Sequence, residues 1–280
     1  MKLLWSVAVS CLSALVVSPA PVQAEHLSVQ LMRATCRVSG PNTAGTALLL
    51  TRPVAGTPPQ NQAVLVTAAH VFETMQGEQA TLLCRQKEPD GTYKKLPVPL
   101  PIRKDKQPLW TKHPDADVAA LVVKLPETAD MAGIPVELLA TDDLLKQYDI
   151  HAGDEVRCLG FPHQFEHNQA AFPVLRTGLI SSLSVLPTKT TKNLMVSYNT
   201  FEGDSGGPVY IAESNRVVEG NPQPQNVRLI LGLVHGQHFL DEDIRTPYEI
   251  RKVRHRLGLA IVVHATFIRE TIEKLPAPGP

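Results

Sequence analysis

The segment YNTFEGDSGGPVY, residues 198–210, places a serine among glycines, with an acid directly before it and a Gly-Pro pair close behind. Glycine adopts backbone conformations that other residues avoid, and it lets other backbone approach closely. A nucleophilic Ser205 would explain such surroundings. An ordinary tight turn favours the same residues, so the interpretation needs support from other parts of the chain.

The segment also fits G-x-S-x-G, which in α/β-hydrolases places a nucleophilic serine between a strand and a helix. Here Gly206, Gly207 and Pro208 follow the serine, and two glycines with a proline make a poor helix interior. The next residues, VYIA, predict a strand instead. In α/β-hydrolases the histidine comes after the serine, so a base that lies upstream argues against that fold.

Two upstream segments supply such a base and an acid. The apolar run VLVTAAH ends in His70, and Asp117 opens the run VAALVV, which predicts a buried strand. The order His70, Asp117, Ser205 is that of a chymotrypsin-type triad, with the serine as nucleophile, the histidine as general base and the aspartate as its orienting partner. Asp115 competes for the third place. We prefer Asp117 because it leads straight into the strand, whereas Asp115 follows a proline in the approaching loop.

These motifs, TAAH, DVAAL and GDSGGPV in this order, resemble the chymotrypsin-fold serine proteases. The resemblance covers nearly the whole chain after residue 24, through AGTALLL (44–50), GDEVRCLGFP (153–162), RTGLISSL (176–183) and LGLVHG (231–236). It implies an all-β fold of two packed six-stranded antiparallel β-barrels with a short C-terminal helix. It also implies a serine endopeptidase that forms an acyl-enzyme, and the absence of an activation site in residues 25–38 favours the secreted members of the bacterial type.

A predicted signal peptide and the resemblance together divide the chain into four expected parts. Residues 1–24 are the expected signal peptide, and residues 25–125 the expected first barrel, with the histidine and aspartate of the triad. Residues 126–152 form the interdomain connection. Residues 153–280 form the second barrel, with the nucleophilic serine, and the C-terminal helix. The active site is then the cleft between the barrels.

Residue periodicity predicts local structure independently of the family. Alternating apolar and polar residues predict strands over MRATCRV (32–38) and QATLLCRQ (79–86), and PDGTY (89–93) predicts a hairpin turn. TDDLLKQY (141–148) predicts a helix that Thr141 or Asp142 would cap. A C-terminal helix is predicted by three apolar residues that share one face, Ile268, Ile272 and Leu275.

In the family, backbone N–H groups stabilise the negative oxygen that forms when the serine attacks, and these groups map onto Gly203 and Ser205. Many members pair the acid before the nucleophile with a new N-terminus made by activation cleavage, but residues 25–38 contain no such site. Asp204 needs another partner, because a buried carboxylate without one is costly. Arg157 and Arg176 are the candidates.

The resemblance places the substrate pocket beside residues just before the nucleophile and beside LGLVHG. Asn199 stands where members specific for Arg or Lys carry an aspartate, so we expect poor cleavage after basic residues and weak preference for small or polar uncharged ones. Thr200 and His235 resemble the threonine and histidine of glutamate-specific members. However, His235 comes three residues after Gly232 instead of two, and such a slip turns a strand side chain to the opposite face. His235 either contributes to the pocket or lines the cleft without touching it.

The first 24 residues predict a secretory signal peptide, with Lys2, an apolar run from Leu3 to Val17 and small residues before a cleavage site at Glu25. The apolar run is shorter than the roughly 20 residues of a membrane-spanning helix, and no later stretch is long and apolar enough. We expect a secreted or periplasmic protein with no membrane span in the mature chain.

The composition indicates neither a nucleic-acid partner nor a cofactor. The 27 Lys and Arg residues balance 27 Asp and Glu residues, so no basic excess favours nucleic acid. Of the ten histidines, those in HQFEH (163–167) come nearest to a metal site, but no third ligand lies nearby. The expected partners are a polypeptide substrate and a protein inhibitor or regulator.

Cys36 and Cys84 lie on the apolar side of predicted strands in the first barrel. An exported protein meets an oxidising compartment, which allows a disulfide between them. Burial as free thiols explains them nearly as well. Cys158, in VRCLGF, is interpreted as a small buried residue and not as a nucleophile.

A function of another class also fits the fold, namely a catalytically silent member that binds a partner through its cleft. The presence of all three triad residues and of the glycine loop argues against it. A complete triad nevertheless does not by itself prove turnover.

Overall fold

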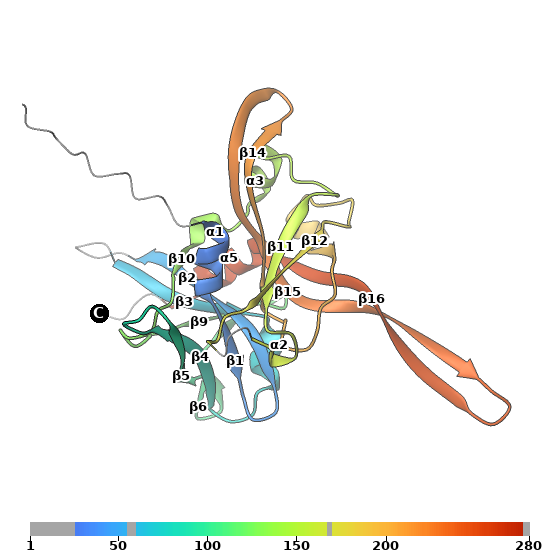
Figure 1. Ribbon diagram of the computed structural model, residues 1–280, viewed down its shortest axis with the longest axis horizontal. Helices are drawn as coiled ribbons and strands as arrows, with labels where there is room; N and C mark the ends of the chain where they lie inside the picture. The colour runs from blue at the N-terminus through green and yellow to red at the C-terminus, as the bar shows by residue number, and fades with distance from the viewer. Residues whose placement is uncertain (1–25, 55–59, 167–169, 277–280) are drawn as a thin grey trace, which may run out of the picture.

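The computed structural model describes residues 26–54, 60–166 and 170–276, and the predicted signal peptide lies outside these residues. Most of the described chain is β-strand, arranged in two large and mainly antiparallel sheets with a short helix near the C-terminus (Figure 1). This architecture agrees with the predicted all-β class.

The first sheet has eight strands where six were predicted. Two short strands account for the difference, since one pairs with β9 and the other lies parallel to β2. The path through the sheet is β5-β4-β1-β2-β3-β9-β8, with β10 beside β2. The strands are β1 (Thr35–Ser39), β2 (Ala44–Val54), β3 (Gln60–Thr67), β4 (Gln79–Lys87), β5 (Tyr93–Pro101), β8 (Thr111–Lys112), β9 (Ala119–Val122) and β10 (Ile134–Pro135). A separate small ribbon joins β6 (Arg103–Lys104) and β7 (Gln107–Pro108).

The second sheet has the six strands that were predicted, in the order β12-β11-β14-β15-β16-β13. Its outer strands approach each other at one isolated bridge between Ile180 and Val196. Closure of either sheet into a barrel stays a prediction. The strands are β11 (Glu155–Gly160), β12 (Val174–Leu179), β13 (Asn193–Ser197), β14 (Pro208–Val218), β15 (Asn221–Arg245) and β16 (Ile250–His264).

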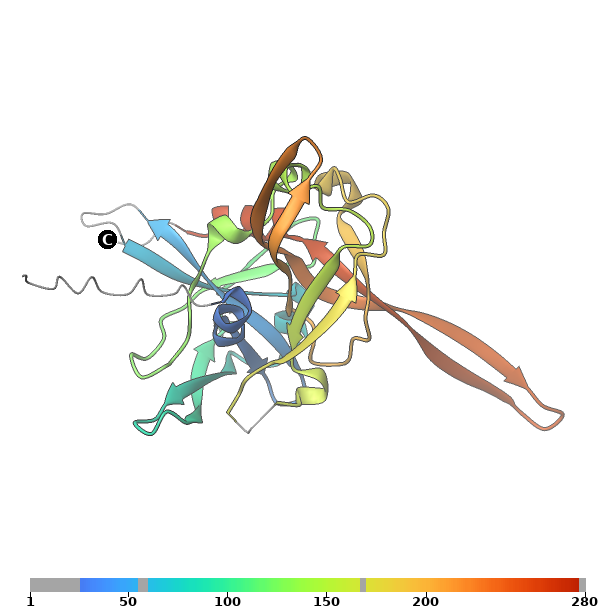
Figure 2. The same cartoon turned by 45° about the horizontal axis from the view of Figure 1, so that its top comes forward.

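Two hairpins of the second sheet extend far beyond it, and the sequence analysis did not predict them. The longer one, formed by β15 and β16, projects from the body in both views (Figures 1 and 2). We call the paired residues 239–245 and 250–256 the arm. Its side chains are mostly exposed and mostly charged. Such a composition is also typical of a loop, which explains why sequence periodicity did not reveal it.

The N-terminal part of the predicted strand 32–38 is wrong, because residues 32–34 belong to a helix. This helix, α1 (Leu27–Ala34), buries Leu27, Leu31 and Ala34, which recur at helical spacing. The strand begins only at Thr35. Alternation over seven residues was too short a pattern to separate the end of one element from the start of the next.

The other local predictions are confirmed. Strands β4 and β5 form the expected hairpin around the turn at residues 88–92. Helix α3 (Asp142–Gln147) is capped by Thr141, whose hydroxyl accepts a hydrogen bond from Leu144 N–H. Helix α5 (Ala265–Glu273) and the residues after it bury the predicted apolar face. Because α5 contacts β9 of the first sheet and β15 of the second, it ties the two sheets together.

The disulfide considered for Cys36 and Cys84 is absent from the structure, where both are buried free thiols. The Cys36 thiol points across its strand pair and donates a weak hydrogen bond to the Ala47 carbonyl, at 3.6 Å. Burial raises the pKa of Cys84 to about 11 and that of Cys158 to about 12. These thiols are therefore protonated core residues, as was interpreted for Cys158.

Candidate active site

The structure brings His70 and Asp117 together through the pairing of two strands. Strand β3 ends at Thr67, three residues before His70, and Thr67 pairs with Ala119 of β9, two residues after Asp117. His70 lies in the first turn of α2 (Ala69–Thr74). Its Nδ1 is 2.6 Å from Asp117 Oδ2, and its backbone N–H donates to Oδ1 at 2.9 Å. The carboxylate therefore fixes both the ring and the backbone of His70.

Asp115, the competing acid, has a different role. It is exposed, and its backbone N–H donates to Nδ1 of the buried His113. For Asp117, burial opposes ionisation, but hydrogen bonds from His235 and His70 outweigh burial and hold its pKa well below the usual value. An ionised Asp117 favours the His70 tautomer that carries its proton on Nδ1.

His235 also faces Asp117 and not the cavity beside Ser205. Its Nδ1 lies 3.6 Å from Asp117 Oδ2, and its Nε2 lies 3.0 Å from Asn193 Oδ1. The register between β15 and β16 shifts between Val234 and Gly236, and such an irregularity redirects side chains. Counting residues from Gly232 could not reveal the direction of the His235 side chain, because such a count assumes a regular strand.

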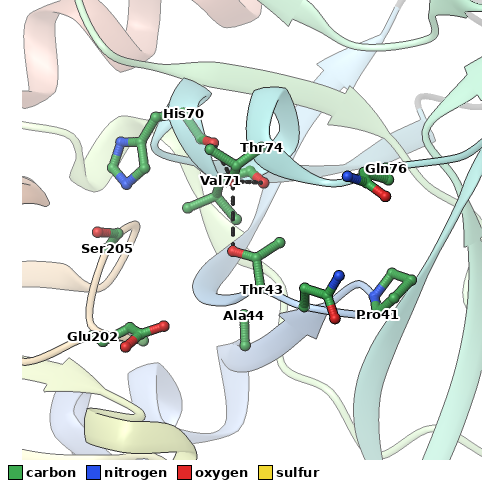
Figure 3. Close-up of a pocket in the computed structure, with 11 residues that line it drawn as sticks. Pro41, Thr43, Ala44, His70, Val71, Thr74, Gln76, Glu202 and Ser205 are labelled. Atoms are coloured by element: carbon green, nitrogen blue, oxygen red, sulfur yellow. Dashed lines mark hydrogen bonds between the residues drawn. The ribbon is translucent and has the colours of Figure 1, made fainter.

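Ser205 lies on the turn before β14, and it borders a cavity of about 350 Å³ together with His70. Figure 3 shows the His70 ring above Ser205 on one side of this cavity. His70 follows β3 of the first sheet, and Ser205 precedes β14 of the second. The structure thus brings together the three residues that the sequence singled out, His70, Asp117 and Ser205.

The glycines around Ser205 are required by the backbone. Gly203 has a φ of +96°, and a Cβ there would lie 2.3 Å from the Phe161 carbonyl oxygen. Gly206 has a φ of +88°, and a Cβ there would lie 2.0 Å from the Thr46 carbonyl oxygen. Any other residue would clash and adopt a strained conformation, so the turn depends on glycine at both positions.

This turn leaves two backbone N–H groups available. In the described part of the chain, the N–H groups of Gly203 and Ser205 have no hydrogen-bond acceptor. The N–H groups of the two neighbouring residues do have acceptors, since Asp204 N–H donates to the Phe201 carbonyl and Gly206 N–H donates to the Val234 carbonyl. Backbone donors are normally paired, so two free ones beside a serine can receive an anionic oxygen.

Thr46 holds the turn in place, and the sequence analysis did not identify it. Its hydroxyl donates to the Gly203 carbonyl at 2.7 Å and accepts from Phe161 N–H at 3.3 Å. Its own N–H donates to the Ser205 carbonyl at 2.8 Å. Thr46 is fully buried and is the one polar side chain in AGTALLL. A hydroxyl inside such an apolar run was the available signal.

Asp204 is bound by Arg176 and not by Arg157. Both guanidinium Nη atoms of Arg176 donate to the Asp204 carboxylate, and Phe201 N–H donates to it at 2.7 Å. Arg157 instead donates to the Ala212 carbonyl. Burial alone would lower the pKa of Arg176, but the hydrogen bonds and charge of Asp204 outweigh burial and raise it. Asp204 therefore has an internal cationic partner.

Asn199 and Thr200 lie beside the same turn but not on the cavity wall. The Asn199 carbonyl accepts a hydrogen bond from Arg176 at 3.1 Å. Thr200 is 4% exposed, and its hydroxyl has no hydrogen-bond partner among the described residues. Their assignment to the substrate pocket stays a prediction.

The described residues contain no group of three His, Cys, Asp or Glu side chains placed to hold a metal ion. Of the segment HQFEH, His163 packs on the Phe201 ring at 5.2 Å, and His167 lies outside the described residues. Across the residues that the structure describes, no helix is long and apolar enough to cross a membrane.

The fold and the site together define the chymotrypsin-like class, with a His–Asp pair beside strands of the first sheet and a glycine-flanked serine on a turn of the second. The sequence profile of the trypsin-like peptidase domain matches residues 56–218, which is more than half of the chain. The chain belongs to the trypsin-like peptidase family, as its resemblance indicated.

Similar solved structures have low sequence identity to this chain. The inactive form of the Rv3671c protease is 17% identical, with 93% of this chain and 98% of that chain covered and a TM-score of 0.48. A mutant of Rv3671c from M. tuberculosis H37Rv, also in its inactive form, is 17% identical, with 94% and 97% covered and a TM-score of 0.46. The structure of HBP is 12% identical, with 90% and 96% covered and a TM-score of 0.49. No curated protein sequence matches the chain.

Proposed function

We propose that this protein is a serine endopeptidase that works through His70, Asp117 and Ser205. The observation that carries the proposal is the bond of Asp117 to both His70 Nδ1 and His70 N–H, with Ser205 on the same cavity as His70. Membership of a peptidase family is consistent with a polypeptide substrate. The finer predicted architecture, two closed barrels with their cleft at this site, belongs to the same proposal.

Each triad residue has a distinct step. Asp117 accepts a hydrogen bond from the Nδ1–H group of His70. The lone pair on His70 Nε2 is therefore free to take the Ser205 proton as the hydroxyl attacks the substrate carbonyl. His70 then donates that proton to the leaving amine, and an acyl-enzyme remains on Ser205. Water, activated by His70 in the same way, releases the acyl group.

The free N–H groups of Gly203 and Ser205 supply the electrostatic part of the mechanism. They are fixed before the substrate arrives, because Thr46 binds the Gly203 and Ser205 carbonyls and Arg176 binds the Asp204 carboxylate between them. Donors that need no rearrangement stabilise the developing oxyanion more effectively than water does. Loss of one such donor typically lowers kcat by about 10² to 10³.

The specificity, location and regulation proposed from the sequence extend this function. A neutral Asn199 and Thr200 favour small or polar uncharged side chains before the scissile bond and disfavour Arg or Lys there. The apolar N-terminal segment supports export and cleavage before Glu25, to a secreted or periplasmic location. A protein inhibitor or regulator that binds the cleft is the further proposed partner.

Labelling with a fluorophosphonate tests the mechanism, because this probe reacts with an activated serine. We expect mature wild-type protein to label and to cleave a casein substrate, and Ser205→Ala and His70→Ala to do neither. Circular dichroism of each variant checks that it is folded. A folded wild-type protein that neither labels nor cleaves would instead favour the catalytically silent binding protein.

A further inference from the structure

The cavity beside Ser205 has walls from three segments of the chain. The loop before β2 contributes one wall, helix α2 a second, and the serine turn the third (Figure 3). His70, Ser205 and Glu202 lie on one side of the cavity, and Pro41 and Gln76 lie on the other. The cavity, of about 350 Å³, has the size of a small binding site.

The position of His70 identifies the part of a substrate that this cavity would meet. In the proposed mechanism His70 gives its proton to the leaving amine, so the chain after the scissile bond leaves the reaction centre on the His70 side. The cavity continues along α2 from His70 to Val71 and Thr74. It therefore lies on the leaving-group side, away from Asn199 and Thr200.

Glu202 is the only carboxylate among the described residues that line the cavity. Its side chain is exposed, and no hydrogen bond or ion pair binds it within the described part of the chain. Of the cations around this turn, Arg176 is paired with Asp204, and Arg256 packs on the neighbouring Phe201 ring without forming an ion pair with Glu202. Glu202 thus gives this cavity a negative charge that no ion pair among the described residues neutralises.

The remaining walls suit a long side chain with a charged end. Pro41, Ala44 and Val71 supply apolar surface, and Asn42 and Gln76 supply neutral polar groups. The Thr74 hydroxyl donates to the His70 carbonyl at 2.8 Å, so its proton is already used. Lysine and arginine bury their methylene groups on apolar surface while the charged end reaches a polar partner.

We propose that this cavity binds the residue directly after the scissile bond and that Glu202 makes it prefer lysine or arginine there. The inference rests on the proposed peptidase function and adds a preference on the leaving-group side. It is compatible with the poor cleavage expected when Lys or Arg comes directly before the scissile bond, because a side chain at that position would enter a different pocket.

Three peptides that differ only after the scissile bond test the inference. They carry Lys, Gln or Glu at that position, with a fluorophore and quencher at the ends. We expect wild-type kcat/KM to fall in the order Lys, Gln, Glu, by roughly two- to fivefold per step, the range of an exposed ion pair. The ratio of kcat/KM for the Lys peptide to that for the Glu peptide should shrink at about 1 M salt, where charges are screened over about 3 Å. A preference that came from the shape of the side chain would not change with salt.

Glu202→Gln should bring the Lys-to-Glu ratio close to one, and Glu202→Lys should reverse it. The ratio is taken within each variant, so a change in overall activity cancels. Glu73→Gln is the matched control, because Glu73 lies on α2 next to Thr74 but outside the cavity lining. This control should keep the wild-type ratio.

Binding of the same peptides to Ser205→Ala, measured by fluorescence anisotropy, separates this inference from the proposed function. A preference for the Lys peptide that Glu202→Gln abolishes supports the inference even if wild type never cleaves. Equal binding and equal cleavage of the three peptides, unchanged in Glu202→Gln, overturns it while leaving the peptidase function intact. A shared loss of preference in Glu73→Gln also overturns it.

Discussion

At the scale of single residues, the site depends on two buried or half-buried carboxylates that have different partners. Asp117 binds His70 twice and lies near His235, whereas Asp204 binds Arg176 and Phe201 N–H. The first carboxylate orients the proposed base. The second anchors the turn that carries the nucleophile.

Asp117→Asn should fold but lose kcat by a factor on the order of 10⁴, because an amide stabilises the wrong His70 tautomer. Hydrolysis of a peptide ester measures this loss. The matched control is Asp115→Asn, which should retain activity close to that of wild type, since only its backbone contacts His113. If Asp115→Asn proves to be the inactive variant, the acid has been misassigned.

Arg176→Met should destabilise the protein by about 3 kcal/mol, because it leaves the 1%-exposed Asp204 carboxylate buried without its cation. We also expect slower fluorophosphonate labelling, since the turn would lose its anchor. Arg157→Met is the control, and it should cost about 1 kcal/mol, because the Ala212 carbonyl loses its donor and the exposed Glu155 loses only a long ion pair. Equal urea midpoints for the two variants would contradict this account of Asp204.

At the scale of elements, the junction between β16 and α5 carries a buried histidine. His264 ends β16, pairs with Gly232 of β15 and precedes the first residue of α5. Its Nε2 has no hydrogen-bond partner among the described residues. Burial lowers its pKa to about 4, and the charge of Asp142 opposes this only partly. The folded state therefore favours the neutral ring.

The free energy of unfolding should consequently fall by about 3 kcal/mol as the pH falls from about 6.5 to about 4. The sign follows because the unfolded chain binds a proton at His264 in this range and the folded chain does not. His264→Gln should remove most of this slope in urea denaturation measured at several pH values. His255→Gln on the exposed arm is the control, and it should leave the slope unchanged. An unchanged slope in His264→Gln would contradict the assignment.

At the scale of the whole molecule, the arm is attached to the site but contributes little to the core. It begins where Arg256 packs on Phe201, with the guanidinium 4.6 Å from the ring centroid. Beyond that point its strands contact mainly each other, through pairs such as Asp241 and Arg254. An isolated two-stranded hairpin is marginally stable. The body of the protein should therefore fold without the outer part of the arm.

Replacement of residues 241–254 by Asn-Gly, a turn suited to a two-residue hairpin, should change the free energy of unfolding by less than about 1 kcal/mol. Fluorophosphonate labelling should continue at the wild-type rate, because Arg256 remains on Phe201. Urea denaturation and labelling kinetics measure the two effects. A loss of either would show that the arm supports the body.

The other long hairpin, which β14 and β15 form, provides the contrast, because Arg216 of β14 anchors it to the body. This side chain is 9% exposed and bridges Asp154 and Glu213 while donating to the Tyr148 and Asp149 carbonyls. Arg216→Met should cost about 3 kcal/mol, as expected when one partner of a buried charge network is removed.

The sequence by itself determined the family and the reacting residues of the proposed site. His70, Asp117 and Ser205 could be identified because each stands in a short motif whose chemistry is local: a strand followed by an imidazole, an acid opening a buried strand, and a serine among glycines. Helix caps and hairpin turns were predictable for the same reason, since backbone conformation and hydrogen bonding over four or five residues decide them.

Only the tertiary structure decided which distant groups meet. Arg176 and not Arg157 binds Asp204, His235 turns to Asp117 through an irregular strand register, and Thr46 holds the serine turn from another sheet. The arm and the eighth strand of the first sheet likewise depend on pairing between segments. These contacts depend on burial and hydrogen bonding between residues that are far apart in the chain. No local sequence pattern predicts them, because the free energy that favours one partner over another arises only when the sheets pack.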